Sequence, residues 1–185
     1  MKRVSKSTAR SRRPAAHRSG GAPRPVGCAV ITASDTRRGR KDTAGALIER
    51  LLTQAGHRVT TRAWVRDEPA ALRRAARAAL ARAGVDVLIV TGGTGLGLRD
   101  CTPEALAPLA GRAVPGFGER FRALSVGQVG TAAWLSRAGA FVARGRLVVM
   151  LPGSRAAVEL ALKQLLLPEL VHAVRMLGRF KPSEE

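Results

Sequence analysis

The apolar positions of this 185-residue chain follow two patterns: short continuous runs, and stripes that recur every three or four residues. Three runs, at 26–32, 85–90 and 147–151, predict strands that are buried on both faces. An alternating stretch at 57–65 predicts one more strand, with only one face turned inward. Small or polar residues follow each of these stretches, and we expect the strands to end there.

Stripes with helical spacing lie between the predicted strands. The first helix starts at Asp42 or Thr43, which are both good N-cap residues, and Gly56 ends it. The second starts at Pro69, which suits the first helical turn, and its buried stripe is expected to reach Ala83.

Apolar stripes predict further helices in the second half of the chain. We expect one over 117–124 and another over 130–143, with Trp134 on the packing side of the latter. Ser154 is expected to cap a long C-terminal helix, which Pro168 should kink or interrupt.

Strands and helices that alternate over short links predict an α/β fold with right-handed crossovers. The length suits one domain. We expect a basic N-terminal tail over 1–25, a folded domain over 26–178, and a short C-terminal tail over 179–185.

The net charge of +19 is unevenly spread, because residues 1–25 carry eight lysines and arginines and no acid. We expect that stretch to be disordered. It could be an electrostatic arm for nucleic acid, a transit peptide or a solvated leader. The chain has no Tyr for stacking on bases and no base-reading motif, which favours the solvated leader over nucleic-acid binding.

No apolar run reaches the roughly 18 residues that span a bilayer, and no secretory signal precedes the domain, so we expect no membrane partner. The two cysteines, Cys28 and Cys101, make no disulfide framework or metal cluster, which fits a reduced cytoplasm. Cys101 is expected to be a small buried hydrophobe rather than a reactive thiol.

The richest chemistry lies where the 85–90 strand ends, at Thr91. A loop with four glycines follows, then Asp100, then a helix start with Thr102 as N-cap and Pro103 as first helical residue. Glycine lets main-chain N–H groups approach an anion, so the layout predicts an anion-binding corner. Neither the P-loop pattern nor the dinucleotide pattern fits the spacing. A tight turn without a ligand is the alternative.

Two other predicted strands also end in small polar residues, at 34–36 and 152–154. The carboxyl ends of parallel strands share one edge of a sheet, where open α/β folds bind their ligands. We therefore expect these two segments to meet the 91–100 loop and to bind a phosphate-bearing ligand with it.

Several motifs resemble, in order and spacing, those of the MoaB/Mog family of molybdenum-cofactor biosynthesis proteins. The resemblance covers about residues 26–175, and its most specific part is Thr-Gly-Gly-Thr-Gly at 91–95 with Arg-Asp-x-Thr-Pro-Glu at 99–104. The other motifs are Ser-Asp-Thr at 34–36, Asp-Thr-Ala-Gly at 42–45, Gly-Phe-Gly-Glu at 116–119, Gly-Thr at 130–131, Ser-Arg-Ala at 136–138 and Pro-Gly-Ser at 152–154. The Gly-Phe-Gly-Glu and Pro-Gly-Ser motifs favour the MoaB branch.

The resemblance implies a three-layer α/β/α fold around a mostly parallel mixed sheet, assembled as a homotrimer or homohexamer. It also implies binding of molybdopterin, transfer of AMP from Mg-ATP to its terminal phosphate in active members, and contact with other molybdenum-cofactor enzymes. By position in the motifs, Asp67 and Asp100 would be the catalytic acids. They would hold Mg²⁺, which prefers oxygen ligands.

The resemblance also implies a set of substrate contacts, in which Arg99 and Arg137 are the expected phosphate clamps. The whole set comprises Ser34, Asp35, Thr91, Gly92, Gly93, Thr94, Gly95, Arg99, Ser136, Arg137, Pro152, Gly153 and Ser154.

Some members of the MoaB branch lack the transfer step, so a non-catalytic molybdopterin-binding or scaffold protein is the alternative function. The presence of both Asp67 and Asp100 favours an enzyme. The chain departs from the family at residues 1–25 and at Cys101, where valine is common.

Overall fold

The computed structural model describes residues 24–179 of the chain. The predicted tails, 1–25 and 179–185, lie almost wholly outside this range, so both stay predictions, as does the disorder expected for 1–25. Within the described part, no helix is long and apolar enough to cross a membrane.

Six strands form one mixed sheet. In chain order they are β1 (Gly27–Ala33), β2 (Arg58–Val65), β3 (Val87–Thr91), β4 (Arg112–Ala113), β5 (Gly139–Ala143) and β6 (Arg146–Leu151). Their order across the sheet is β2-β1-β3-β6-β5-β4, with the first four parallel and with β5 antiparallel to both neighbours. The mixed α/β sheet confirms the predicted fold class.

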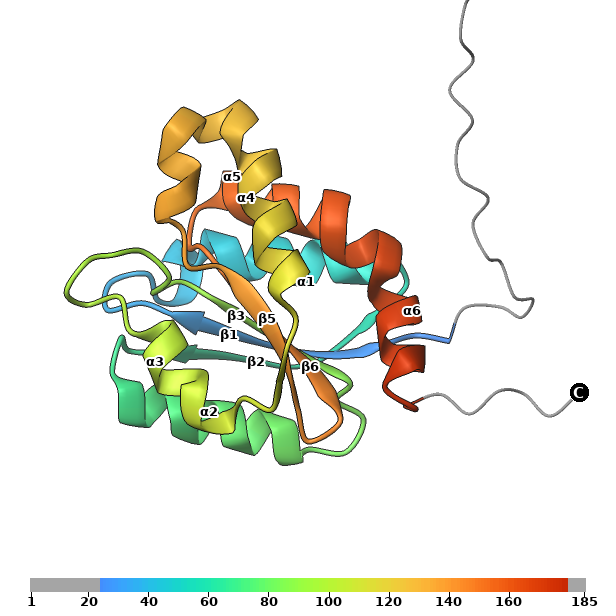
Figure 1. Cartoon of the computed structure of the whole chain (residues 1–185). Coiled ribbons are helices and arrows are strands. Elements are labelled where there is room, and N and C mark those ends of the chain that lie inside the picture. Colours follow the sequence, from blue (N-terminus) through green and yellow to red (C-terminus); the bar gives the residue numbers. More distant parts are fainter. Residues whose placement is uncertain (1–23, 180–185) are drawn as a thin grey trace, which may run out of the picture.

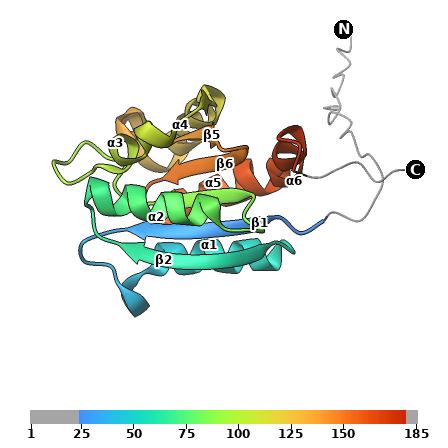
Figure 2. The ribbon, with the colours of Figure 1, turned by 90° about the horizontal axis from the view of Figure 1, so that it is seen from below.

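Helices cover both faces of the sheet (Figure 1). One face carries α1 (Thr43–Gln54), α4 (Pro115–Val129), α5 (Arg155–Ala161) and α6 (Leu167–Met176), and the other carries α2 (Pro69–Ala81) and α3 (Thr102–Leu106). Figure 2 shows α2 lying along the second face. Successive residues of β1 and β3 alternate between the two cores, which is why these strands read as unbroken apolar runs.

The predicted helix ends are largely confirmed. Asp42 caps α1 by accepting from the Gly45 N–H, and Ser154 caps α5 by accepting from the Ala157 N–H. Pro168 interrupts the C-terminal helix as expected: a π-helical turn at Leu162–Leu166 separates α5 from α6. Such a turn is one way to accommodate the hydrogen bond that proline cannot make.

The prediction of a helix over 130–143 is wrong. A 3₁₀ segment, Gly130–Leu135, is followed by β5, which forms a hairpin with β6. The two residues at its turn, Arg144 and Gly145, both have positive φ, and this combination is typical of a tight β-hairpin. Trp134, predicted to face the core, is 71% exposed.

Two smaller expectations are also corrected. The N-cap of α3 is Cys101, and Thr102 is already helical, so its hydroxyl is free to donate to the Gly92 carbonyl at 2.8 Å. Ala83 is exposed because α2 ends at Ala81 and Ala83 lies in the turn that follows.

Asp42 joins α1 to the sheet as well as capping the helix. Its carboxylate is buried and accepts hydrogen bonds from the Thr32 hydroxyl at 2.9 Å and from Arg62 at 2.7 Å. Arg62 also pairs with Glu49 at 2.9 Å, but that carboxylate is 44% exposed. Removing the buried carboxylate of Asp42 should therefore cost far more stability than removing the exposed one of Glu49.

Replacing Asp42 by Ala should lower the free energy of unfolding by about 2–4 kcal/mol, because the cap and a buried charge partner are lost together. Glu49→Ala is the matched control and should change it by no more than about 0.5 kcal/mol. Urea denaturation measures both. Equal effects of the two changes would contradict this account.

Candidate functional site

The loops that were expected to converge do so. The parallel strands β1, β2, β3 and β6 all end at the same edge, and Figure 1 shows the loops after β1, β2 and β3 together at the left of the sheet. Behind them, the Thr91 hydroxyl donates to the Pro152 carbonyl at 2.9 Å, which joins the glycine loop to the 152–154 segment. The fold thus brings residues from four separate parts of the sequence to one site.

The glycine loop begins at Gly92, whose main chain lies very close to the end of β1. A Cβ at Gly92 would lie 2.1 Å from the Ala33 carbonyl oxygen, and its φ of +102° is rarely adopted by residues with side chains. The Gly92 N–H donates to the Leu151 carbonyl at 2.9 Å, so the loop starts wedged between β1 and β6. Only glycine fits this position.

Arg137 holds the glycine loop from the outside. Its Nε donates to the Gly95 carbonyl and its Nη2 to the Asp100 carbonyl, both at 2.8 Å, and its main-chain N–H donates to the Thr94 carbonyl at 2.9 Å. Its Nη1 forms an ion pair with Glu104. The predicted phosphate clamp is therefore engaged in fixing the loop, and a direct phosphate contact stays a prediction.

Asp35 and Asp67 bind each other's main chain. The Asp35 N–H donates to Asp67 Oδ2 at 3.1 Å, and the Asp67 N–H donates to Asp35 Oδ1 at 3.3 Å. Arg99 donates twice to Asp35 Oδ2, at 3.0 and 2.7 Å. Hydrogen bonding to Arg99 lowers the pKa of Asp35, so this carboxyl is ionised and already paired.

The second oxygen of Asp67 is different. Its Oδ1 is buried and has no hydrogen-bond partner among residues 24–179. Burial raises the pKa of Asp67, and the negative charges of Asp35 and then Asp100 raise it further. A buried carboxylate oxygen without a partner is costly, and it indicates a position where a ligand can bind.

Asp67 and Asp100 both lie against the glycine loop. A Cβ at Gly93 would lie 3.3 Å from Asp67 Oδ1, and a Cβ at Gly95 would lie 2.8 Å from Asp100 Oδ2. Asp100 Oδ2 also accepts from the Gly97 N–H at 2.9 Å. The missing side chains therefore leave room for both carboxylates beside the loop.

The donor set of this site fits Mg²⁺. Residues 24–179 contain no group of three or more His, Cys, Asp or Glu side chains arranged to hold a metal. Mg²⁺, however, is usually held by one or two carboxylates together with water and substrate phosphates. Asp67, through its unpartnered Oδ1, and Asp100 supply that number of carboxylates.

A pocket of about 450 Å³ adjoins the glycine loop and is large enough for a small-molecule ligand. Its lining includes three of the expected substrate contacts, Ser136, Pro152 and Ser154, together with the ring of Phe121. Gly153 lies beside it: a Cβ there would be 3.4 Å from Gly92 Cα. The pocket and the loop can therefore hold two parts of one ligand.

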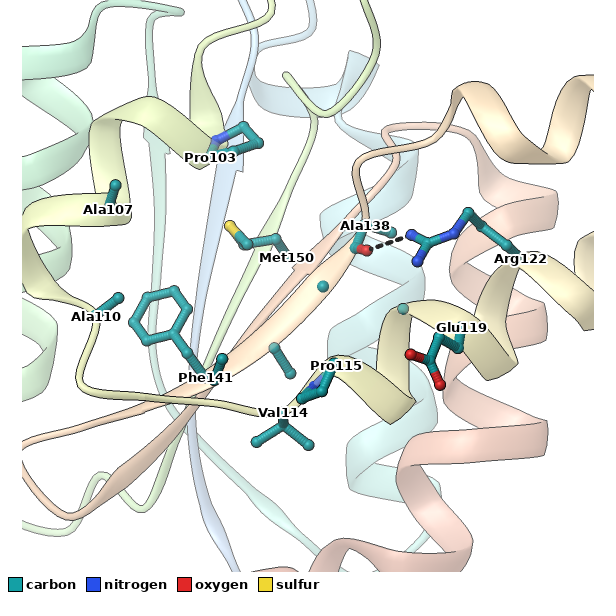
Figure 3. A pocket seen from close by; sticks show the side chains of 14 residues that line it. Pro103, Ala107, Ala110, Val114, Pro115, Glu119, Arg122, Ala138, Phe141 and Met150 are labelled. Carbon is teal, nitrogen blue, oxygen red and sulfur yellow. Dashed lines mark hydrogen bonds between the residues drawn. The ribbon is translucent and has the colours of Figure 1, made fainter.

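Another pocket, of about 350 Å³, lies over β5 and β6 between α3 and α4. Phe141 and Met150 face into it, with Glu119 and Arg122 at one end (Figure 3). Arg122 donates to the Ala138 carbonyl at 3.2 Å. None of the expected substrate contacts lines this pocket, so we do not assign the ligand to it.

Three of the expected contacts act mainly through the main chain or the loop structure. Thr91 and Thr94 are almost fully buried, at 0% and 2% exposure, so their hydroxyls support the loop rather than face a ligand. Ser34 Oγ accepts from the N–H groups of Thr36 and Arg37, which makes a local turn.

Sequence reasoning gave no role in the site to Arg37, and it gave Thr102 a role only at the start of a helix. Arg37 is exposed, and it donates to the Gly153 carbonyl at 2.8 Å, which ties the β1 loop to the β6 loop. Its position three residues after Ser34 was the available signal, because serine commonly binds a nearby N–H in a turn.

A glycine loop, two acids and a neighbouring pocket at the carboxyl ends of parallel strands are typical of α/β domains that bind a phosphorylated small molecule. The family model described as "Probable molybdopterin binding domain" matches residues 29–172. The chain belongs to the MoaB/Mog family of molybdenum-cofactor biosynthesis proteins, which confirms the resemblance.

Relatives cover nearly the whole domain. The chain is 44% identical to Molybdenum cofactor biosynthesis protein B of Bacillus subtilis, over 86% of this chain and 95% of that protein. A crystal structure of a Molybdenum cofactor biosynthesis protein B superposes with a TM-score of 0.83 at 40% identity, covering 86% of this chain and 100% of the other. The tungsten cofactor synthesizing protein MoaB from Pyrococcus furiosus superposes at 0.68, with 36% identity over 84% and 98% of the two chains.

The ligand-free Asp67→Asn variant should melt at the same temperature as the wild type, or slightly higher, at neutral pH. Asparagine keeps an oxygen for the Asp35 N–H but removes a poorly solvated charge. Because the pKa of Asp67 is raised in the folded state, ionisation of this carboxyl costs stability above that pKa.

The stability difference should therefore vanish as the pH falls far enough to neutralise the carboxyl in both states. Thermal melting from neutral to acidic pH checks this. A clearly less stable Asp67→Asn variant at neutral pH would show that the charge is favourable in the free protein.

Proposed function

We propose that this protein binds molybdopterin and transfers AMP from Mg-ATP to its terminal phosphate, releasing pyrophosphate. The observation that carries the proposal is the buried, unpartnered Oδ1 of Asp67, which faces the glycine loop near Asp100. Membership of a molybdenum-cofactor biosynthesis family supports the choice of a pterin as substrate.

The two acids and the glycine loop would bind different parts of the Mg-nucleotide. Asp67 and Asp100 would hold the cation, and the N–H groups of residues 93–95 would donate to phosphate oxygens. When bound, Mg²⁺ neutralises charge on the phosphates and stabilises departing pyrophosphate. Arg99 is held by Asp35, and a direct contact of Arg99 with a phosphate stays a prediction.

The transfer itself needs little more than this alignment. An oxygen of the molybdopterin phosphate, ionised at neutral pH, attacks the α-phosphorus of ATP. A new P–O bond forms as the bond between the α-phosphorus and the bridging oxygen breaks, and the electron pair leaves on pyrophosphate. No general base is required, so the residues act by positioning and charge.

The pocket beside the loop is the proposed place for the pterin ring system. Its 450 Å³ and its lining of small apolar residues with Ser136 and Ser154 suit a flat heterocycle with polar edges. The ligand's phosphate would then reach the N–H groups of the glycine loop. Two free thiols, Cys28 buried and Cys101 half-buried, agree with the cytoplasmic location that we propose for this reaction.

Asp100→Asn keeps the shape of the side chain and removes its charge. We expect AMP transfer to fall by about 100-fold or more, because the cation loses one of its two carboxylates. Binding of molybdopterin alone should survive, since its phosphate still meets the loop N–H groups. Pyrophosphate release with ATP, Mg²⁺ and molybdopterin measures the first effect, and fluorescence or calorimetric titration measures the second.

Glu68→Gln is the control, because Glu68 is exposed and pairs only loosely with Arg66, at 4.0 Å. Transfer by Asp100→Asn at the wild-type rate would remove Asp100 from the catalytic site. A wild type that binds molybdopterin but releases no pyrophosphate would establish the non-catalytic binding or scaffold function instead.

We further propose that the protein assembles as a homotrimer or homohexamer and contacts other molybdenum-cofactor enzymes. Phe121 is buried in the monomer core, but four apolar side chains of the same region are exposed: Val126, Val129, Trp134 and Leu135. Aromatic and aliphatic residues of this kind anchor protein interfaces.

Trp134→Glu should dissociate the assembly into monomers, because it places a charge at a contact that becomes desolvated. Met176→Glu is the matched control, since Met176 is equally exposed, at 75%, but lies on α6. Light scattering at micromolar concentration compares both variants with the wild type. A monomeric wild type would overturn the proposed assembly, and a Trp134→Glu oligomer would place the contact elsewhere.

A further inference from the structure

The two acids that we assign to the cation come from loops that are not neighbours. Asp67 follows β2 and Asp100 lies in the loop after β3, and β1 runs between these two strands in the sheet. Strand pairing alone therefore does not fix the separation of the two carboxylates. A group on the β1 loop that binds the loops on both sides would fix it.

Asp35 is placed to do this. One oxygen, Oδ1, accepts from the Asp67 N–H at 3.3 Å, and the other, Oδ2, accepts from Arg99 at 2.7 and 3.0 Å. Arg99 immediately precedes Asp100 in the chain. The carboxylate of Asp35 therefore links both acid-bearing loops, one through each of its oxygens.

We infer that Asp35 is a positioning residue that, with Arg99, sets the spacing of Asp67 and Asp100 for a divalent cation bound to a nucleotide. The inference rests on the proposed function, and it assigns Asp35 a role other than direct contact with substrate. A side chain that orients a metal ligand changes the affinity for the metal without contacting the metal itself.

The role is one of geometry rather than of overall stability. The Arg99 side chain is 68% exposed and that of Asp35 is 33% exposed. Exposed ion pairs contribute little to the free energy of unfolding, but two hydrogen bonds from Arg99 to one oxygen of Asp35 restrict the direction of the pair. A small displacement of a reacting group can still cost about 100-fold in rate.

Asparagine cannot replace Asp35 in this role. A carboxylate offers two acceptor oxygens, whereas a side-chain amide offers one oxygen and a nitrogen that only donates. Asp35→Asn can therefore satisfy either the Asp67 N–H or Arg99, but not both. Arg99→Lys keeps the charge and loses the two-pronged geometry, so it weakens only the link to the Asp100 loop.

The first measurement is amide hydrogen exchange in the nucleotide-free protein. Asp35→Asn should speed exchange at Asp67 or across 97–101, and Arg99→Lys should speed it only across 97–101. Glu68→Gln, a change on the same loop as Asp67 that leaves the hydrogen bonds of Asp35 in place, should leave both unchanged. Melting temperatures should stay within about 2 °C of the wild type for all three variants.

The second measurement is the Mg²⁺ dependence of ATP binding, followed by calorimetry without molybdopterin. The Mg²⁺ concentration for half-maximal binding should rise about tenfold in Asp35→Asn and by a smaller factor in Arg99→Lys. The double variant should be no worse than Asp35→Asn alone, because both changes break one linkage. In the transfer assay kcat should fall while KM for molybdopterin is unchanged.

Wild-type exchange and wild-type Mg²⁺ dependence in Asp35→Asn would overturn the inference. A wild type with no Mg²⁺-dependent ATP binding would instead refute the proposed function. In that case the exchange measurement still decides whether Asp35 couples the two loops, so the two failures are distinguishable.

Discussion

Repulsion among three carboxylates at one edge of the sheet is the constraint around which the loops of this protein are arranged. Asp35 is balanced by Arg99, and Asp100 accepts a hydrogen bond from a glycine N–H. Asp67 is left with one satisfied oxygen and one buried, unpartnered oxygen. In the free protein, the negative charge at Asp67 Oδ1 is poorly solvated, which is unfavourable. A bound cation would compensate this charge.

The support for these acids comes mostly from main-chain atoms. The glycine loop starts in a gap that admits no side chain, beside the Ala33 carbonyl, and Arg137 fixes its far end through carbonyl oxygens. Main-chain contacts of this kind define the course of a loop more tightly than side-chain packing, because they leave few rotamers to choose from.

The central strands and the capped helix starts could be predicted because their signals are local. β1, β3 and β6 are buried on both faces and read as continuous apolar runs, and Asp42 and Ser154 mark helix starts directly. The 130–143 segment was not predictable from its stripe, because apolar residues at helical spacing also occur where a short 3₁₀ turn precedes a strand. The decisive signal was the Arg144–Gly145 turn.

The site was predictable as a set of motifs but not as a network. The convergence of three loops follows from parallel strands, and so the neighbourhood of Thr91, Asp35 and Gly153 was expected. The partners of Arg137 and Arg37 are carbonyl oxygens, which every residue possesses and no sequence pattern reveals. The Asp35–Arg99 pair joins positions 64 residues apart, so only the folded chain shows it.

The way in which Arg137 holds the glycine loop has a consequence for how this site can diverge. The guanidinium of Arg137 donates hydrogen bonds to carbonyl oxygens of the loop. These bonds do not depend on the side chains at the loop tip, where Leu96 and Leu98 are exposed. Mutations at those two positions can accumulate without disturbing the loop's anchor. The exposed side chains beside the site can thus diverge between relatives while the hydrogen bonds that position Asp100 are kept.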